Sequence, residues 1–155
     1  MRDVLKNMAS LPEVEIAETP EDLKVIAERT LQSKEKVIYY VGSVEVLMQG
    51  YERTYDQGFY IPARTELGIF VKMLVPDTEV MRAYQANDAG EARETRALPE
   101  DVRMDYSAMI HDDHVVFFLQ EPRLYGLSIT SPALAEMMKA MFNDMWRNAK
   151  NSCAL

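Results

Sequence analysis

Two histidines and two aspartates stand together in the segment His111-Asp112-Asp113-His114. Imidazole and carboxylate groups bind metal ions, and a histidine can also act as a general acid or base. The four residues span a predicted tight turn, however, and adjacent strand residues point to opposite faces of a sheet. The sequence has no HExxH motif and no paired cysteines. We therefore expect a solvated turn here and no metal.

The sequence also lacks a complete nucleophile motif. Its one cysteine, Cys153, stands two residues from the end of the chain. A single terminal thiol cannot form a disulfide that crosslinks the fold. The GxSxG elbow, the Walker loop and the GxGxxG motif are all absent from the sequence. These observations favour binding over catalysis, with no cofactor.

Polar turns follow two successive apolar segments that have the composition of buried strands. Gly42-Ser43 follows the first segment, and Pro76-Asp77-Thr78 follows the second. In open α/β sheets, ligands favour the crevice at the carboxyl ends of the strands, where backbone N–H groups can hold an anion. A plain capped turn is the structural alternative. We predict a ligand cleft formed by Gly42, Ser43, Asp77 and Thr78.

Arg96 is a further candidate because it lies on a short predicted strand near this edge. Its planar guanidinium could bind an anion or the hydroxyl groups of a ligand. The alternative is a surface ion pair with Glu94 or Asp101, which is the commoner fate of an arginine.

The first half of the chain alternates strands with helices. Strands are predicted at Val14–Ala17, Lys36–Val41 and Ile69–Val75. Helices are expected from Thr19-Pro20, from Gly42-Ser43 with interruptions near Gly58 and Pro62, and from 76–78 to about Asp88. This β-α-β-α-β-α order predicts a largely parallel sheet with helices packed on it.

The second half has a different pattern. Strands are predicted at Glu94–Leu98, Tyr106–His111, His114–Gln120 and Leu124–Thr130, with a hairpin at Asp112-Asp113. A long helix follows, capped by Ser131 and begun by Pro132. Its apolar stripe comprises Leu134, Met137, Met138, Met141, Phe142, Met145 and Trp146. We expect the stripe to be core, with part of it available to a partner.

Composition and length limit the possible functions. A chain of 155 residues fits one domain, and 27% charged residues is ordinary for a globular protein. The net charge of -8 and the scattered basic residues argue against direct nucleic-acid contact. No signal-peptide pattern and no apolar run of about 20 residues occurs, so we expect a cytoplasmic location without membrane contact.

Taken together, several segments resemble the C-terminal effector domain of the TrmB family of transcriptional regulators, found mainly in archaea and some bacteria. The matching segments are Glu18–Ser33, Val37–Ser43, Val71–Thr78, Arg93–Pro99, Ile110–Phe118, Gly126–Ser131 and Phe142–Lys150. The resemblance covers roughly residues 11–150. It implies a phospholipase-D-like fold that senses a small molecule, often a sugar, and that normally follows a DNA-binding winged helix-turn-helix.

Phospholipase D enzymes carry a His-x-Lys-x4-Asp motif with a histidine nucleophile and a phosphate-binding lysine. Counting back from Asp112, the lysine position holds Ser107 and the histidine position holds Asp105. Counting back from Asp113 gives Ala108 and Tyr106 instead. In either register the nucleophile is missing, and with it the covalent route that divides the reaction into two steps.

The resemblance thus predicts an α/β, phospholipase-D-like mixed sheet and a non-catalytic sensor domain. We expect residues 1–12 to be the remnant of a linker helix, 13–150 the effector domain and 151–155 a tail. A small polar ligand, a sugar or a phosphorylated metabolite, is expected near the residues Gly42, Ser43, Asp77, Thr78, Arg96 and Asp112. A homodimer is expected, with DNA binding assigned to a winged-helix domain that is either absent or separate. The alternatives are a diverged phosphodiesterase or nuclease that uses His111 or His114, and a pure protein-interaction module.

Overall fold

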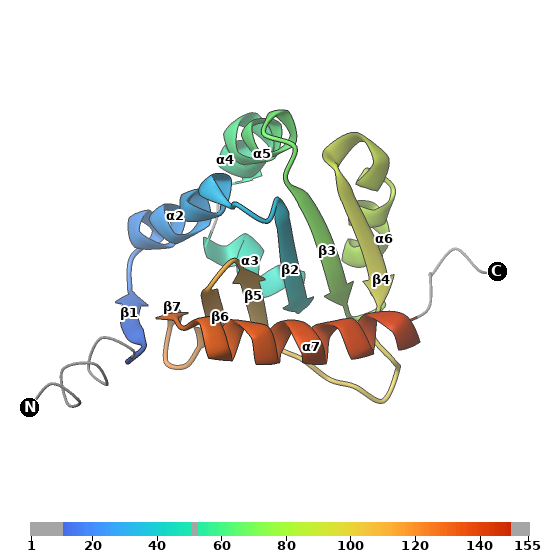
Figure 1. The fold of residues 1–155 in the computed structure, drawn as a ribbon. Coiled ribbons are helices and arrows are strands. Elements are labelled where there is room, and N and C mark those ends of the chain that lie inside the picture. Colours follow the sequence, from blue (N-terminus) through green and yellow to red (C-terminus); the bar gives the residue numbers. More distant parts are fainter. Residues whose placement is uncertain (1–10, 51–52, 150–155) are drawn as a thin grey trace, which may run out of the picture.

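The computed structural model describes residues 11–50 and 53–149, which form a seven-stranded mixed sheet (Figure 1). The strand order is β1-β7-β6-β5-β2-β3-β4. Strands β2, β3 and β4 are parallel, whereas β1, β7, β6, β5 and β2 pair in antiparallel fashion. The strands are β1 (Glu13–Ala17), β2 (Val37–Gly42), β3 (Phe70–Val75), β4 (Arg93–Ala97), β5 (Ser107–His111), β6 (His114–Gln120) and β7 (Leu124–Thr130).

Helices cover both faces of the sheet. The long helix α7 (Pro132–Asn148) crosses one face alone (Figure 1). The other face carries α2 (Pro20–Arg29), α3 (Val44–Gly50) and α6 (Glu79–Gln85). At one end of the sheet lie the short helix α4 (Arg53–Tyr55), the π-helix η2 (Asp56–Tyr60) and α5 (Ile61–Glu66); two 3-10 turns, η1 (Thr30–Gln32) and η3 (Asp88–Glu91), complete the elements.

The helix starts predicted from the sequence are confirmed by their caps. Thr19 and Asp22 form a reciprocal capping box at the start of α2, and Pro20 occupies its first turn. Ser131 accepts a hydrogen bond from the Leu134 N–H at the start of α7. Such caps satisfy N–H groups that the helix itself leaves without partners. No helix among the described residues is long and apolar enough to cross a bilayer.

Side chains on alternate sheet positions divide the core into two layers. Ile38 and Tyr40 of β2 point toward α2, α3 and α6, while Val41 packs beneath α7. Under α7, Phe142 is fully buried, stacks on Trp146 and meets Tyr39 edge-on. The predicted stripe of α7 is therefore core only in part, because Met137 and Met141 are about half exposed.

One prediction about the strands is wrong. The β-α-β pattern of the sequence counts Val14–Ala17 in the parallel half as a first strand, possibly at an edge. β1 is an edge strand, but it pairs antiparallel with β7, the last strand, with Glu13 opposite Thr130. The hydrophobic pattern of a strand does not encode which neighbour it pairs with. The parallel part of the sheet is therefore limited to β2, β3 and β4. The predicted linker-helix remnant, apart from Leu11 and Pro12, and the predicted tail lie outside the described residues.

Candidate functional site

A cavity of about 370 Å³ opens at the carboxyl ends of β2 and β3, where topology predicts a ligand crevice. Residues just before β5 and at the end of β6 close its other side. We call it the carboxyl-edge cleft. Its lining residues are Ser43, Val44, Glu45, Val46, Val75, Pro76, Thr78, Val80, Met104, Asp105 and Gln120.

The position of Ser43 depends on Gly42 and on the start of β5. The Gly42 backbone has a φ of +114°, and its lack of a side chain lets the Tyr106 carbonyl approach. The Ser43 N–H donates to that carbonyl at 3.2 Å, and the Tyr40 hydroxyl donates to the Ser43 carbonyl at 2.7 Å. Burial raises the pKa of the Tyr40 phenol, so the hydroxyl keeps the proton for this bond. These contacts hold Ser43 beside Asp105.

The polar groups of the cleft are carboxylates and neutral side chains. Glu45 and Asp105 line it together with Ser43, Thr78 and Gln120. Among the described lining residues none is a lysine, arginine or histidine. Thr78 uses its hydroxyl oxygen to cap α6 at the Met81 N–H, 3.2 Å away. The cleft therefore presents mainly hydrogen-bond acceptors and carries negative charge.

The structure brings together some of the predicted ligand-binding residues at this edge. Ser43 and Thr78 both line the cleft, and Gly42 shapes it through its backbone. Asp77 lies beside the cleft but is not part of its lining; its carboxylate pairs with Arg82 at 3.2 Å on the surface. The prediction that two strand-to-helix turns meet at one edge is thus confirmed by the parallel pairing of β2 with β3.

Arg96 is placed on the other face of the sheet. It pairs across the ladder with Leu74, which packs beneath α7. Its guanidinium lies 4.1 Å from the centre of the Trp146 ring, donates to the Trp146 carbonyl at 2.9 Å and pairs with Glu94 at 2.8 Å. Through these contacts Arg96 stabilises the packing of the C-terminal end of α7 on the sheet. It does not line the carboxyl-edge cleft.

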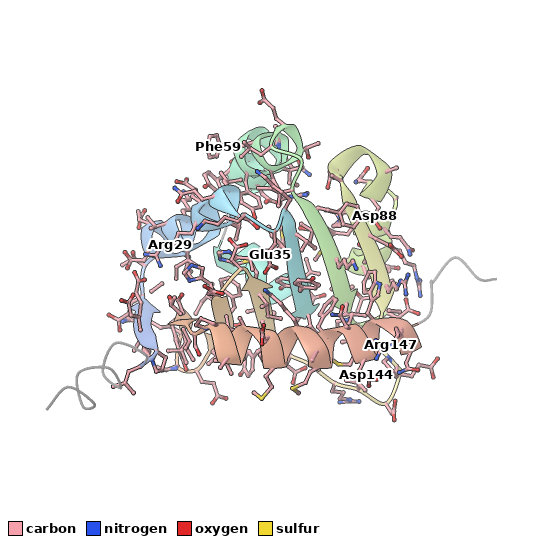
Figure 2. All side chains as sticks on the ribbon, in the orientation of Figure 1. Arg29, Glu35, Phe59, Asp88, Asp144 and Arg147 are labelled. Carbon is pink, nitrogen blue, oxygen red and sulfur yellow. The ribbon has the colours of Figure 1, made fainter. Side chains whose placement is uncertain are left out.

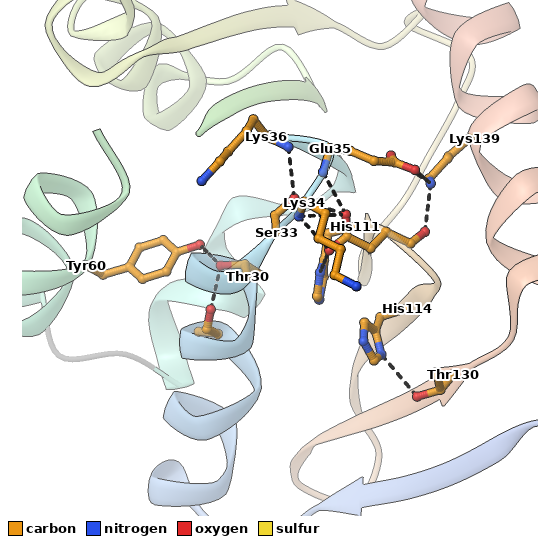
Figure 3. Close-up of polar contacts among 12 residues, drawn as sticks. Thr30, Ser33, Lys34, Glu35, Lys36, Tyr60, His111, His114, Thr130 and Lys139 are labelled. Atoms are coloured by element: carbon orange, nitrogen blue, oxygen red, sulfur yellow. Dashed lines mark hydrogen bonds and ion pairs between the residues drawn. The ribbon is translucent and has the colours of Figure 1, made fainter. Parts of the chain in front are cut away.

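Asp112 lies at the opposite edge of the sheet from the cleft. It sits in the turn after β5, one strand length or roughly 17 Å from the residue opposite Gly42. Its carboxylate accepts hydrogen bonds from the N–H groups of Lys34 and Glu35 at 3.0–3.1 Å and from the Ser33 hydroxyl at 3.3 Å (Figure 3). Burial alone would raise the pKa of this carboxyl, but these donors lower it overall. Asp112 anchors the loop that leads into β2.

The rings of His111 and His114 come together across the β5–β6 hairpin, although we expected the residues of this segment not to converge. His111 and His114 are directly opposed in the β5–β6 ladder, and their rings stack with centroids 4.8 Å apart (Figure 3). His114 Nδ1 lies 3.0 Å from the Thr130 hydroxyl. Burial lowers the pKa of His111 to about 4, with help from His114, so His111 is neutral at pH 7. No group of three or more metal-binding side chains occurs in the described part of the chain.

Comparison with known proteins bears on the fold. No family model and no curated protein matches this sequence. Solved structures do match: the archaeal chromatin protein TrmBL2, with a TM-score of 0.61 and 18% identity over 96% of this chain and 60% of that one; and Nuc, a phospholipase D family member from Salmonella typhimurium, with a TM-score of 0.60 and 16% identity over 90% of this chain and 97% of that one.

A further match is NucT from Helicobacter pylori, with a TM-score of 0.61 and 10% identity over 90% of this chain and 98% of that one. The chain has a phospholipase-D-like fold. The mixed sheet predicted from the TrmB resemblance is confirmed, and so is the long final helix predicted from its cap and its apolar stripe. At sequence identities of 10–18%, these matches show a shared fold and no more than that. The chain spans 60% of the length of TrmBL2.

Sequence reasoning identified part of the cleft and missed the rest. Asp105 was singled out only as the position where a nucleophile would stand, and the structure places it in the cleft lining. Glu45 and Gln120 were missed. Glu45 could have been found from its place in the first turn of α3, two residues after Ser43. No local sequence feature marks Gln120, which reaches the cleft through the pairing of β6 with β5.

Proposed function

We propose that this chain is a regulatory domain whose carboxyl-edge cleft binds an uncharged, hydroxyl-rich small molecule such as a sugar, without converting it. The observation that carries the proposal is the lining itself, which holds the carboxylates of Asp105 and Glu45 and, among the described residues, no cationic side chain.

The chemistry of the lining selects among polar ligands. A carboxylate accepts hydrogen bonds and has none to give, so it matches the hydroxyl donors of a sugar. A phosphate would place negative charge beside two carboxylates, which is unfavourable in a partly enclosed site. Ser43 and Gln120 can both donate and accept, and so can complete the pairing with vicinal hydroxyls. The cleft therefore favours the sugar over the phosphorylated metabolite.

The nucleophile position supports binding without turnover. In the register that ends at Asp112, Asp105 occupies the place of the phospholipase D histidine and Ser107 that of the lysine. Ser107 is buried at the start of β5. A site with these side chains lacks the charge-neutralising cation on which phosphoryl chemistry depends.

Occupancy of the cleft is proposed to be read out through a homodimer in the cytoplasm. TrmBL2 is described as a chromatin protein with a novel mode of DNA binding, and this chain resembles only part of it. We infer that DNA contact comes from a separate winged-helix domain and that the ligand favours one arrangement of the dimer. The net charge of -8 supports the absence of direct DNA contact by this domain.

A thermal-shift screen of neutral sugars and their phosphate esters, followed by calorimetry, tests the proposal. We expect at least one neutral sugar to bind with one-to-one stoichiometry, and Ser43→Ala and Asp105→Asn each to weaken it at least tenfold. Asp144→Asn is the matched control, since Asp144 pairs with Arg147 on the outer side of α7 (Figure 2). Tighter binding of a phosphate ester, or unchanged affinity in Asp105→Asn, would contradict the proposal.

A second candidate, a diverged phosphodiesterase, is favoured by the likeness to Nuc and NucT. It predicts hydrolysis of bis(p-nitrophenyl) phosphate that disappears in the His111→Ala, His114→Ala double variant. Both histidines lie at the sheet edge opposite the carboxyl-edge cleft. We expect no difference in rate between this variant and the parent chain.

A further inference from the structure

A second cavity, of about 300 Å³, lies on the face of the sheet that carries α3 and α6. It is enclosed by α3, η2, the start of α5, α6 and η3. A smaller void of about 70 Å³ continues it toward the sheet and shares Asp56, Ile61, Tyr84 and Arg93 with it. We call the two together the Asp56 cavity. None of the ligand-site residues predicted from the sequence lines it.

Asp56 is the first residue of the π-helix η2, a type of helical turn that is rare and concentrated at functional sites. The far end of η2 is anchored to η1, which follows α2, because the hydroxyl of Tyr60 lies 2.6 Å from that of Thr30 (Figure 3). Within the described residues, no hydrogen bond or ion pair engages the Asp56 carboxyl. Burial raises its pKa and the charge of Glu91 raises it further, while the charges of Arg93 and Arg64 lower it in part.

The two nearby arginines are committed to other partners. Arg93 bonds to the Asp88 and Glu91 carboxylates and to the Tyr84 carbonyl at 2.6–2.8 Å (Asp88 is labelled in Figure 2). Arg64 is buried and donates to the carbonyls of Ile69, Ala92 and Glu91. Both guanidinium groups attract the Asp56 carboxyl through their charge, but their hydrogen bonds go to these other partners.

The charge of the cavity and the apolar side chains that line it indicate which kind of ligand it could bind. The carboxylates of Asp56, Asp88 and Glu91 face two guanidinium groups, so one further cation balances the cluster. The walls are largely apolar, formed by Met48, Ile61, Val80 and the Tyr84 ring. Asp56 is half-buried, and its carboxylate receives no hydrogen bond from the described residues. An ammonium group supplies both the missing donors and the balancing charge.

We propose that the Asp56 cavity binds a small organic ammonium ion, whose N–H groups donate to Asp56 and whose apolar body packs against Met48, Ile61 and Val80. The side-chain amides of Gln57 and Asn87 line the same cavity and can accept a remaining N–H. This site is separate from the carboxyl-edge cleft, and among the described lining residues the two share only Val80.

The probe for this proposal is 2-phenylethylammonium, compared by calorimetry at pH 8 with its neutral analogue 2-phenylethanol and with 3-phenylpropionate. We expect saturable one-to-one binding of the ammonium ion, at least tenfold tighter than either analogue. Asp56→Asn should weaken it at least tenfold. Asp105→Asn, the same substitution in the carboxyl-edge cleft, should leave it unchanged.

A second variant removes the space and keeps the charge. Ala83 lines the cavity from the exposed side of α6, so Ala83→Phe should fill the cavity and abolish binding of the ammonium ion while the thermal transition stays cooperative. Equal affinity of the Asp56→Asn variant and the parent chain would overturn the proposal. So would tighter binding of 3-phenylpropionate, or binding that survives Ala83→Phe. Sugar binding at the carboxyl-edge cleft is measured independently, so the two proposals can fail separately.

Discussion

The carbonyl oxygen of Tyr106 lies 2.1 Å from the point where a Cβ atom on Gly42 would stand. This close approach brings the end of β2 against the start of β5, and with it Ser43 against Asp105. The contact is between backbones, so a side chain at position 42 cannot be accommodated by a change of rotamer. The carboxyl-edge cleft therefore depends on a glycine that itself contributes no ligand-binding group.

Gly42→Ala should destabilise the fold by about 2–4 kcal/mol, because the substitution adds a backbone clash to an unfavourable positive φ. Urea unfolding measures the change. Gly58→Ala is the matched control: a Cβ there meets no atom within 4 Å, and we expect stability equal to or above that of the parent. A loss below about 0.5 kcal/mol in Gly42→Ala would show that the two strands can separate at little cost.

Arg96→Ala should lower the free energy of unfolding by about 1–2 kcal/mol, since it removes both the stacking on Trp146 and the bond to its carbonyl. It should leave ligand affinity at the carboxyl-edge cleft unchanged. Arg82→Ala, which breaks only an exposed ion pair with Asp77, should cost less than about 0.5 kcal/mol. Loss of ligand affinity in Arg96→Ala with unchanged stability would show instead that Arg96 serves the ligand and not α7.

His111 should make stability depend on pH in the mildly acidic range. Its folded pKa of about 4 lies below the ordinary value of 6.5, so the unfolded chain takes up a proton first. The stability that neutral His111 contributes is fully present above pH 6.5. As the pH falls toward 4, the free energy of unfolding decreases by about 3 kcal/mol in all. Urea unfolding at pH 7.5, 5.5 and 4.5 should show the loss in the parent chain and a flatter profile in His111→Gln. Parallel profiles would exclude His111 as the cause.

Asp112 should make stability depend on pH in a more acidic range than His111 does. Its folded pKa is lowered, so its stabilising effect is present above the pKa of the unfolded carboxyl, about 3.9, and is lost as the pH falls through the folded value. At pH 7 Asp112→Ala should cost about 2–3 kcal/mol, because it leaves the N–H groups of Lys34 and Glu35 without their acceptor. Hydrogen exchange of these two amides measures the effect directly. Exchange as slow as in the parent would mean that another acceptor holds the loop.

Much of the secondary structure follows from local sequence. The bounds of β6 and β7 and the start of α7 at Pro132 agree with the predicted ones, because turn residues and caps act over only a few positions. Ser43 and Thr78 could be placed at one edge because parallel neighbours bring their carboxyl ends together. The interruption near Gly58 was visible in the sequence, but its form as a π-helix with Asp56 at its start was not.

The sequence by itself determines that the His-x-Lys-x4-Asp motif is absent, and it determines the caps, most strands and the polar turns, since each depends on residue type and short spacing. Only the tertiary structure decided which side chains share a site. The alternation of side chains across the sheet sends Arg96 to the face beneath α7, and one strand length separates Asp112 from Gly42. Strand pairing and helix packing join residues far apart in the chain, and so they place Asp105 in the cleft and Asp56 in its own cavity.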